Sequence, residues 1–109
     1  MQKQARSIFR ALGWTINEAP RRPGLRYDIL HAASGGSAIA IAITDDQVNA
    51  YNVGLMGNAM SKVDYGALQI VVGKSVAPDA TEAAKARRMA IGQHGEASKL
   101  IEIAVRQLG

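Results

Sequence analysis

Three arginines beside two prolines are the residues of this sequence whose types and spacing most directly suggest chemistry. Arg21, Arg22 and Arg26 lie in or beside the stretch APRRPG, which contains two prolines and a glycine. Proline fixes φ and removes a backbone donor, so this stretch must be a loop. An arginine guanidinium is a planar fork of donors that matches phosphate oxygens. The loop is therefore suited to grip a nucleic-acid backbone, although a solvated hairpin explains the same residues.

The other reactive residue types form no recognisable catalytic or metal-binding pattern. His31 and His94 are far apart and lack metal-ligand spacing, and His31 alternates with apolar neighbours as a packed histidine does. The sequence has no cysteine, which excludes disulfides and thiolate zinc sites. No serine lies in a G-x-S-x-G motif, and no glycine-rich segment precedes a G-K-[ST] triplet. Nucleophilic catalysis and a P-loop are therefore not expected.

The charge of the chain favours an anionic partner. Among 109 residues, 13 are lysine or arginine and 9 are aspartate or glutamate, a formal net charge of +4. Residues 1–30 hold six basic and two acidic side chains, and so carry the whole excess. Contacts between a basic surface and phosphates release condensed counterions, which favours nucleic-acid binding. Solubility alone is the other explanation of this charge.

Composition predicts one folded domain over residues 1–109. Hydrophobic residues make up 48% and charged residues 20%, a balance that excludes a disordered chain. No apolar run approaches the roughly 20 residues needed to span a membrane. The beginning of the chain, MQKQARSIFR, lacks the apolar segment of a secretory signal. We therefore expect a cytoplasmic protein that does not enter a membrane.

The first half of the chain is predicted to form a helix and an antiparallel meander of three strands. Apolar residues on one helical face predict a helix that ends before Gly13. The SGG triplet at 34–36 indicates a tight hairpin. After it, three isoleucines alternate with three alanines, so that Ile39, Ile41 and Ile43 share one face of a strand. The predicted ranges are 2–12 for the helix and 14–18, 25–32 and 37–43 for the strands.

The second half is predicted to alternate helices with one strand. From Thr44, the sequence T-D-D-Q has capping-box spacing, and Asp45 and Asp46 suit the positive end of a helix. The predicted ranges are a helix over 46–61 that buries Val48, Leu55, Met56 and Ala59, a strand over 66–73, and helices over 79–93 and 96–108. The nearly continuous apolar run of the strand is typical of a central parallel strand. The fold class is therefore α/β, a mixed four-stranded sheet flanked by helices in the order αβββαβα.

This order resembles the core of the PD-(D/E)XK nuclease superfamily, the restriction endonuclease-like fold. The resemblance covers residues 2–73 and rests on five stretches: ALGW, RYDI, the isoleucine-rich strand after the hairpin, a helix with Asn49 and Asn52, and VDYGALQIVV. In that family the second strand supplies a metal-binding aspartate, and the third supplies a (D/E)-x-K pair on the same catalytic face. The resemblance implies that carboxylates hold Mg²⁺, which generates hydroxide and stabilises charge on the phosphate, while the lysine polarises the water.

Asp28 matches the family's aspartate, but the (D/E)-x-K position falls on Ala40-Ile41-Ala42. Alanine cannot bind a hard cation, and a single carboxylate is a poor Mg²⁺ site. One explanation is a degenerate relative that uses no cofactor. The other is a rearranged Mg²⁺ site with Asp28 as the metal ligand, Asp45 and Asp46 as further catalytic residues, and Lys62 as the substitute lysine. The alanines themselves fit close packing, natural loss of catalysis or engineered inactivation.

The sequence thus predicts a DNA-binding domain with a nuclease-like fold that is catalytically degenerate. Its candidate nucleic-acid contacts are Arg21, Arg22, Arg26 and Lys62. The first alternative is an active Mg²⁺-dependent endonuclease with the rearranged site. The second is a small homodimeric protein-interaction module without a nucleic-acid role. No pattern in the sequence indicates which DNA sequence or structure would be bound.

Overall fold

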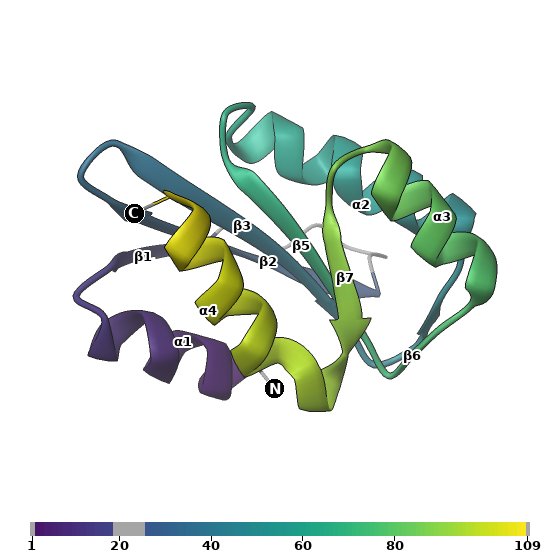
Figure 1. Ribbon diagram of the computed structural model, residues 1–109, viewed down its shortest axis with the longest axis horizontal. Coiled ribbons are helices and arrows are strands. Elements are labelled where there is room, and N and C mark those ends of the chain that lie inside the picture. Colours follow the sequence, from purple (N-terminus) through teal and green to yellow (C-terminus); the bar gives the residue numbers. More distant parts are fainter. Residues whose placement is uncertain (1, 19–25, 109) are drawn as a thin grey trace.

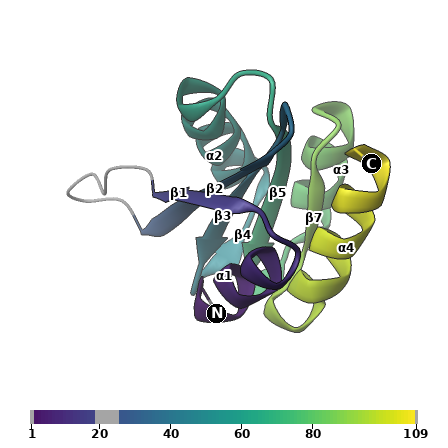
Figure 2. The ribbon, with the colours of Figure 1, turned by 90° about the vertical axis from the view of Figure 1, so that its left-hand side faces the viewer.

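The structure is a computed structural model, and it describes residues 2–18 and 26–108. Its elements, in chain order, are α1 (Gln2–Ala11), β1 (Thr15–Glu18), β2 (Tyr27–Ser34), β3 (Ser37–Thr44), β4 (Gln47–Val48), α2 (Ala50–Val63), β5 (Leu68–Gly73), β6 (Ser75–Val76), α3 (Pro78–Ala86), β7 (Ala90–Gln93), the short 3₁₀ helix η1 (His94–Glu96) and α4 (Ala97–Leu108). Helices α1 and α4 cover one face of the main sheet, and α2 and α3 cover the other (Figures 1 and 2). No helix in the described ranges is long and apolar enough to cross a membrane.

The main sheet is mixed, as the sequence predicts, but it has five strands in the order β1-β2-β3-β5-β7. The β1–β2 and β2–β3 pairs are antiparallel, whereas β3–β5 and β5–β7 are parallel. Strands β4 and β6 form a separate parallel pair beside it. The α/β class is confirmed, and the strand count of four is wrong because β7 lies within the range that the sequence predicts as the end of a helix.

Strand β7 was missed because α3 ends without a sequence signal. The helix predicted to reach residue 93 ends at Ala86, and the chain then turns through Arg88, whose φ is +59°. Left-handed backbone at a helix end is ordinarily supplied by glycine or asparagine. Gly92, which falls within the predicted helix, lies buried in β7, where an added Cβ would come within 2.9 Å of Leu100. The glycine therefore allows α4 to lie close against this strand.

The hairpin between β2 and β3 is confirmed and fixes the register of the sheet. Gly35 and Gly36 have φ of +55° and +88°, as a two-residue type I′ turn requires. Ser34 consequently pairs with Ser37, and the regular register continues to the other end of the hairpin, where Asp28 lies opposite Ile43. This pairing decides which side chains share a face with Asp28.

The start of α2 differs from the prediction. Thr44 does not cap the helix, because its hydroxyl donates to the carbonyl of Arg26 at 2.9 Å and accepts the Asp46 amide at 3.2 Å. The helix begins later, at Ala50, with a capping box formed by Asn49 and Asn52. Gln47 and Val48, which precede this capping box, form β4. The later start changes which side chains face the sheet. Val48 is buried in β4, Met56 is buried as expected, Ala59 is only half-buried, and Leu55 is exposed, while Val53 and Met60 are buried instead.

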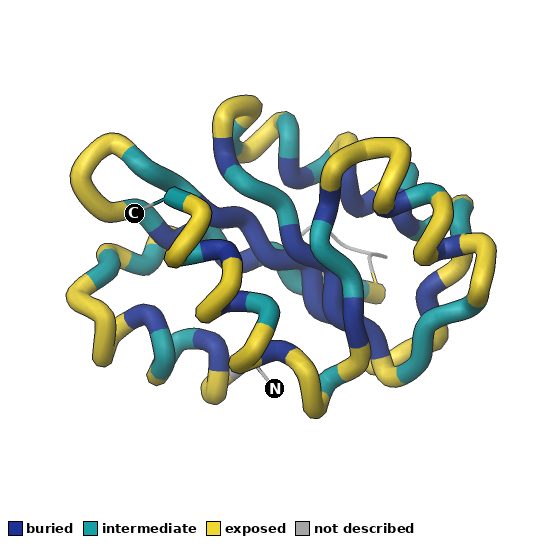
Figure 3. The backbone as a smooth tube through the Cα atoms, viewed as in Figure 1, coloured by how far each residue is buried: buried dark blue, intermediate teal, exposed yellow. Residues whose placement is uncertain are grey.

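The alternating residues of β3 belong to two different cores. The isoleucines, with Phe9 of α1 and Ile101 of α4, form the core on one face. Ala40 and Ala42 are fully buried on the other face, in the core that contains Val53 and Met60 of α2. Figure 3 shows the buried backbone concentrated in the sheet between the helix layers. The small alanine side chains therefore allow α2 to pack close to the sheet, which is the close-packing explanation of this pattern.

Candidate functional site

The polar residues singled out in the sequence gather mainly at one edge of the sheet. Strands β3, β5 and β7 are parallel and end at this carboxyl edge, followed by Asp45 and Asp46, by Lys74 and by His94. The antiparallel β2 begins there, next to Arg26. Ligands of open α/β sheets bind outside the carboxyl ends of parallel strands. This edge is therefore the expected position of a binding site.

Asp28 faces the α1–α4 side of the sheet. It pairs with Ile43, and directly paired residues project to the same face. On β2 it alternates in phase with Leu30 and Ala32, which belong to the core under α1 and α4. The side chain is half-buried. Any catalytic partner on β3 must share this face.

The predicted placement of the (D/E)-x-K pattern on Ala40-Ile41-Ala42 is consequently wrong. Ala40 and Ala42 project to the face covered by α2, away from Asp28. The β3 residues that share the face of Asp28 are Ile41 and Ile43, which are 1% and 7% exposed. Both are apolar and packed in the core, so this part of β3 offers neither a carboxylate nor a lysine to a metal beside Asp28.

Asp46 lies on the α2 side of the sheet, opposite to the face of Asp28. Its carboxylate is 3.9 Å from the guanidinium of Arg26, and the side chains are 55% and 86% exposed. Both residues line a hollow of about 260 Å³ together with Tyr27 and Asn52, on the α2 side. Within residues 2–18 and 26–108, no three histidine, cysteine, aspartate or glutamate side chains are grouped so as to hold a metal ion. Asp28, Asp45 and Asp46 therefore do not fit a shared Mg²⁺ site.

A hydrogen bond from His94 connects the ends of two strands at this edge. Its Nε2 lies 2.7 Å from the carbonyl oxygen of Thr44, so the ring donates a hydrogen bond from the end of β7 to the end of β3. The neighbouring Glu96 accepts the backbone N–H of Gln93 at 3.0 Å. These contacts hold the chain as it turns from β7 into α4. Sequence reasoning gave His94 no such role, because the two residues are fifty positions apart.

The candidate DNA contacts are only partly placed. Arg21 and Arg22, with the predicted loop at 19–24, lie outside the described residues. Arg26 is exposed at the carboxyl edge. Lys62 is exposed in the last turn of α2, a helix that starts near this edge and runs to the opposite one, where β5 begins (Figure 1). The structure therefore does not bring Lys62 together with Arg26.

A second polar cluster lies at the opposite edge and was not predicted. The Nε2 of His31 is 2.8 Å from Asp64, and its Nδ1 is 3.3 Å from the side-chain amide of Asn17. The His31 side chain is only 14% exposed, in keeping with the expected packed histidine. The hydrogen bond from His31 is the main cause that lowers the pKa of Asp64 below its ordinary value of 3.8. The hydrogen bond from the Gly66 amide also lowers this pKa, whereas desolvation of the carboxyl raises it. The cluster links β1 and β2 to the end of α2.

Stability is expected to depend on pH through Asp64. Because folding lowers the pKa of this carboxyl, its stabilising effect is present above pH 3.8 and is lost as the pH falls toward the lowered value. The loss of unfolding free energy caused by Asp64→Asn should therefore be larger at about pH 6 than at about pH 3 in urea titrations. The control is Asp45→Asn, at an exposed position. An Asp64→Asn effect of equal size at both pH values would contradict this assignment.

Comparison with known proteins establishes the fold. No family model matches the sequence, and neither does any curated protein. Among solved structures, EndoMS in its apo form is similar over 84% of this chain, with a TM-score of 0.62 and 13% identity. A repair endonuclease from Pyrococcus abyssi is similar over 84%, with a TM-score of 0.58 and 16% identity. The chain spans less than half of those proteins, 44% and 45% of their lengths. The described structure thus has the α/β fold found in part of these nucleases.

Proposed function

We propose that this chain is a single DNA-binding domain of the PD-(D/E)XK-like fold that does not cleave DNA. The observation that carries the proposal is the pair of buried isoleucines, Ile41 and Ile43, on the face where a partner of Asp28 must lie. The likeness in fold to two nuclease structures supports the link to DNA. The apolar side chains of Ile41 and Ile43, which offer neither a carboxylate nor a lysine on this face, support the absence of cleavage.

The chemistry of Mg²⁺ explains why one aspartate is insufficient. Mg²⁺ takes near-octahedral oxygen ligands and is normally anchored by one or two carboxylates together with phosphates and waters. Beside Asp28, the apolar Ile41 and Ile43 supply no oxygen and cannot orient an attacking water. We therefore assign Asp28 a structural role, with no resident metal and no step that depends on one.

The carboxyl edge is the surface that we assign to DNA. Arg26 stands there with 86% of its side chain exposed, and Arg21 and Arg22 precede it in the chain. Their guanidinium groups suit contacts with phosphate oxygens, which position a protein on DNA without reading its sequence. Binding of this kind is expected to depend strongly on salt and weakly on base sequence.

A salt titration tests this proposal. For about three phosphate contacts, affinity for duplex DNA should fall roughly fortyfold when salt rises from about 50 mM to about 200 mM. Arg26→Ala should remove about one unit from the slope of log affinity against log salt. Fluorescence anisotropy of a labelled duplex measures both quantities.

Lys62→Ala is the matched control, since it removes one exposed cation from the other end of the molecule. Its slope should equal that of the unmodified protein. Equal effects of Arg26→Ala and Lys62→Ala would contradict the placement of DNA at the carboxyl edge. Absence of binding at about 50 mM salt would contradict the DNA-binding proposal as a whole.

A further inference from the structure

Helix α1 carries a row of basic side chains on its outer side. Lys3, Arg6 and Arg10 are three and four residues apart, so they lie along one side of the helix. Lys3 and Arg10 are exposed, and Arg6 is half-buried. The opposite side of α1 packs on the sheet through Ala5 and Phe9, which are 1% and 0% exposed. We call these three residues the α1 basic row.

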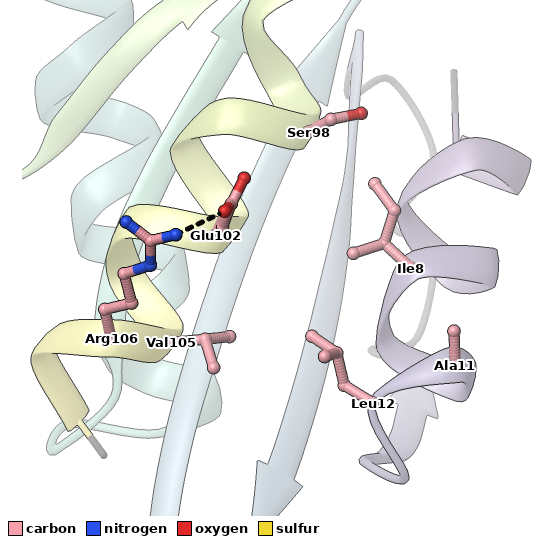
Figure 4. Close-up of a pocket in the computed structure, with 7 residues that line it drawn as sticks. All are labelled: Ile8, Ala11, Leu12, Ser98, Glu102, Val105 and Arg106. Atoms are coloured by element: carbon pink, nitrogen blue, oxygen red, sulfur yellow. Dashed lines mark hydrogen bonds and ion pairs between the residues drawn. The ribbon is translucent and has the colours of Figure 1, made fainter.

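The α1 basic row also points away from α4. Ile8 and Leu12 lie on the side of α1 that faces Val105 of α4 across an apolar hollow (Figure 4). The three basic residues are not among the side chains that line this hollow, as their helical spacing requires. Lys3 and Arg10 are therefore accessible to a partner that approaches from outside the two helices.

The charge of α1 is not explained by the stability of the helix. Its ten residues include three basic and no acidic side chains, whereas the formal net charge of the whole chain is +4. The positive end of the helix dipole favours acidic residues in the first turn and disfavours a cation such as Lys3. A solvated helix face needs polar residues, not cations alone. This excess of positive charge suits a polyanionic partner.

Helix α1 begins at the edge of the sheet that we assign to DNA. Gln4, near the start of α1, donates a hydrogen bond to Ser98, near the start of α4, at 3.3 Å. Helix α4 follows β7 and η1 and therefore starts at the carboxyl edge (Figure 1). Lys3 thus lies toward the edge that carries Arg26, and Arg10 lies about 10 Å further along the axis of α1.

We infer that the α1 basic row is a second part of the DNA-binding surface, in which Lys3 and Arg10 contact backbone phosphates. Their separation of about 10 Å along the helix axis equals the rise of about three base pairs, so both long side chains can reach phosphates of one strand. Such contacts add affinity and salt dependence without reading the base sequence. The inference rests on the proposed DNA binding and extends it from the carboxyl edge along α1.

Two other anionic partners fit the α1 basic row less well. A helix that lies on a membrane buries its apolar side in the lipid, whereas Ala5 and Phe9 of α1 are already buried in the protein core. The centre of a protein–protein interface is depleted in charged residues, whereas this row consists of them. A DNA backbone needs only cations at suitable spacing.

The salt dependence of a double variant, Lys3→Gln with Arg10→Gln, tests the inference. With two contacts added to about three at the carboxyl edge, affinity of the unmodified protein for a duplex of about 20 base pairs should fall roughly five-hundredfold between about 50 mM and about 200 mM salt. The double variant should show the roughly fortyfold fall of the carboxyl edge alone, because its slope of log affinity against log salt is lower by about two.

The matched control is Lys62→Gln with Lys85→Gln, which removes the same charge from exposed positions on α2 and α3. Its slope should equal that of the unmodified protein. Equal slopes of the two double variants would overturn the inference. A lowered urea midpoint of the Lys3→Gln, Arg10→Gln protein with an unchanged slope would also overturn it, because the row would then serve folding.

Protection of lysines from acetylation gives a local readout. Saturating duplex at about 50 mM salt should slow the acetylation of Lys3 several-fold, as measured by mass spectrometry, and leave Lys62 and Lys85 unchanged. Equal rates at Lys3 with and without DNA would overturn the inference. Binding to vesicles of anionic phospholipid that is lost in the Lys3→Gln, Arg10→Gln protein, with no change in its DNA slope, would assign the row to a membrane instead.

Failure of this inference is distinguishable from failure of the proposed function. DNA binding with the same fortyfold salt dependence in all three proteins would overturn the role of α1 and leave binding at the carboxyl edge intact. Absence of DNA binding by the unmodified protein at about 50 mM salt would overturn both.

Discussion

Replacing Phe9 with alanine is expected to lower the free energy of unfolding by about 3–5 kcal/mol, the usual cost of truncating a buried phenylalanine. Phe9 is 0% exposed in the core between α1 and the sheet. Its ring centroid lies 5.8 Å from that of Trp14, and its carbonyl accepts the Trp14 amide at 2.9 Å. The substitution would leave a cavity under α1 that the neighbouring strands cannot close.

Urea unfolding of Phe9→Ala and of Tyr51→Ala provides the test. Tyr51 is also an aromatic residue on a helix, but it is 72% exposed, so its truncation should change stability by less than about 0.5 kcal/mol. A Phe9→Ala effect as small as that of Tyr51→Ala would mean that α1 does not pack on the sheet as described.

Replacing Gly73 with alanine is expected to destabilise the fold by about 1–3 kcal/mol through overpacking. Gly73 is buried at the end of β5, where the short strand β4 passes close by. An added Cβ would lie 2.5 Å from Val48 and 3.1 Å from the carbonyl oxygen of Ser75. Hydrogen bonds from Lys74 to Asp46 and from Ala77 to Val48 hold these segments together, so the chain cannot easily yield.

A double-mutant cycle separates this steric effect from a loss of chain flexibility. The combined Val48→Ala and Gly73→Ala protein should lose less stability than the sum of the two single variants, because Val48→Ala removes the closest atom. Gly95→Ala is the control, since nothing lies within 4 Å of its added Cβ. Additive effects, or an equal cost at Gly95, would contradict the close approach of β4 and β5.

Elements with local signals were predictable from the sequence. The alternation in β3, the two glycines of its hairpin and the apolar run of β5 each specify one structure within a few residues. Strand β7 could not be found in this way, because it has four residues and the left-handed turn before it falls on Arg88. The start of α2 was misplaced because Thr44 has the spacing of a helix cap, whereas its hydroxyl bonds to Arg26 across the β2–β3 pair.

The candidate site was partly predictable. A two-residue turn at Gly35-Gly36 pairs Ser34 with Ser37, and counting back along both strands sets Asp28 against Ile43. The sequence therefore already contained the information that Ala40 and Ala42 face away from Asp28. The contacts of His31 with Asp64 and of His94 with Thr44 were not predictable, since they depend on how strands and helices meet.

The central claim is that this domain holds DNA without cutting it, and one measurement tests both parts. Labelled duplex, single-stranded and branched DNA are each saturated with the protein at about 50 mM salt, Mg²⁺ is added, and anisotropy and strand length are read from the same samples. We predict that the bound DNA stays intact, with or without Mg²⁺, for the unmodified protein and for Asp28→Asn alike. Cleavage that requires Mg²⁺ and disappears in Asp28→Asn would contradict the claim, because it would mean that Asp28 belongs to a working metal site.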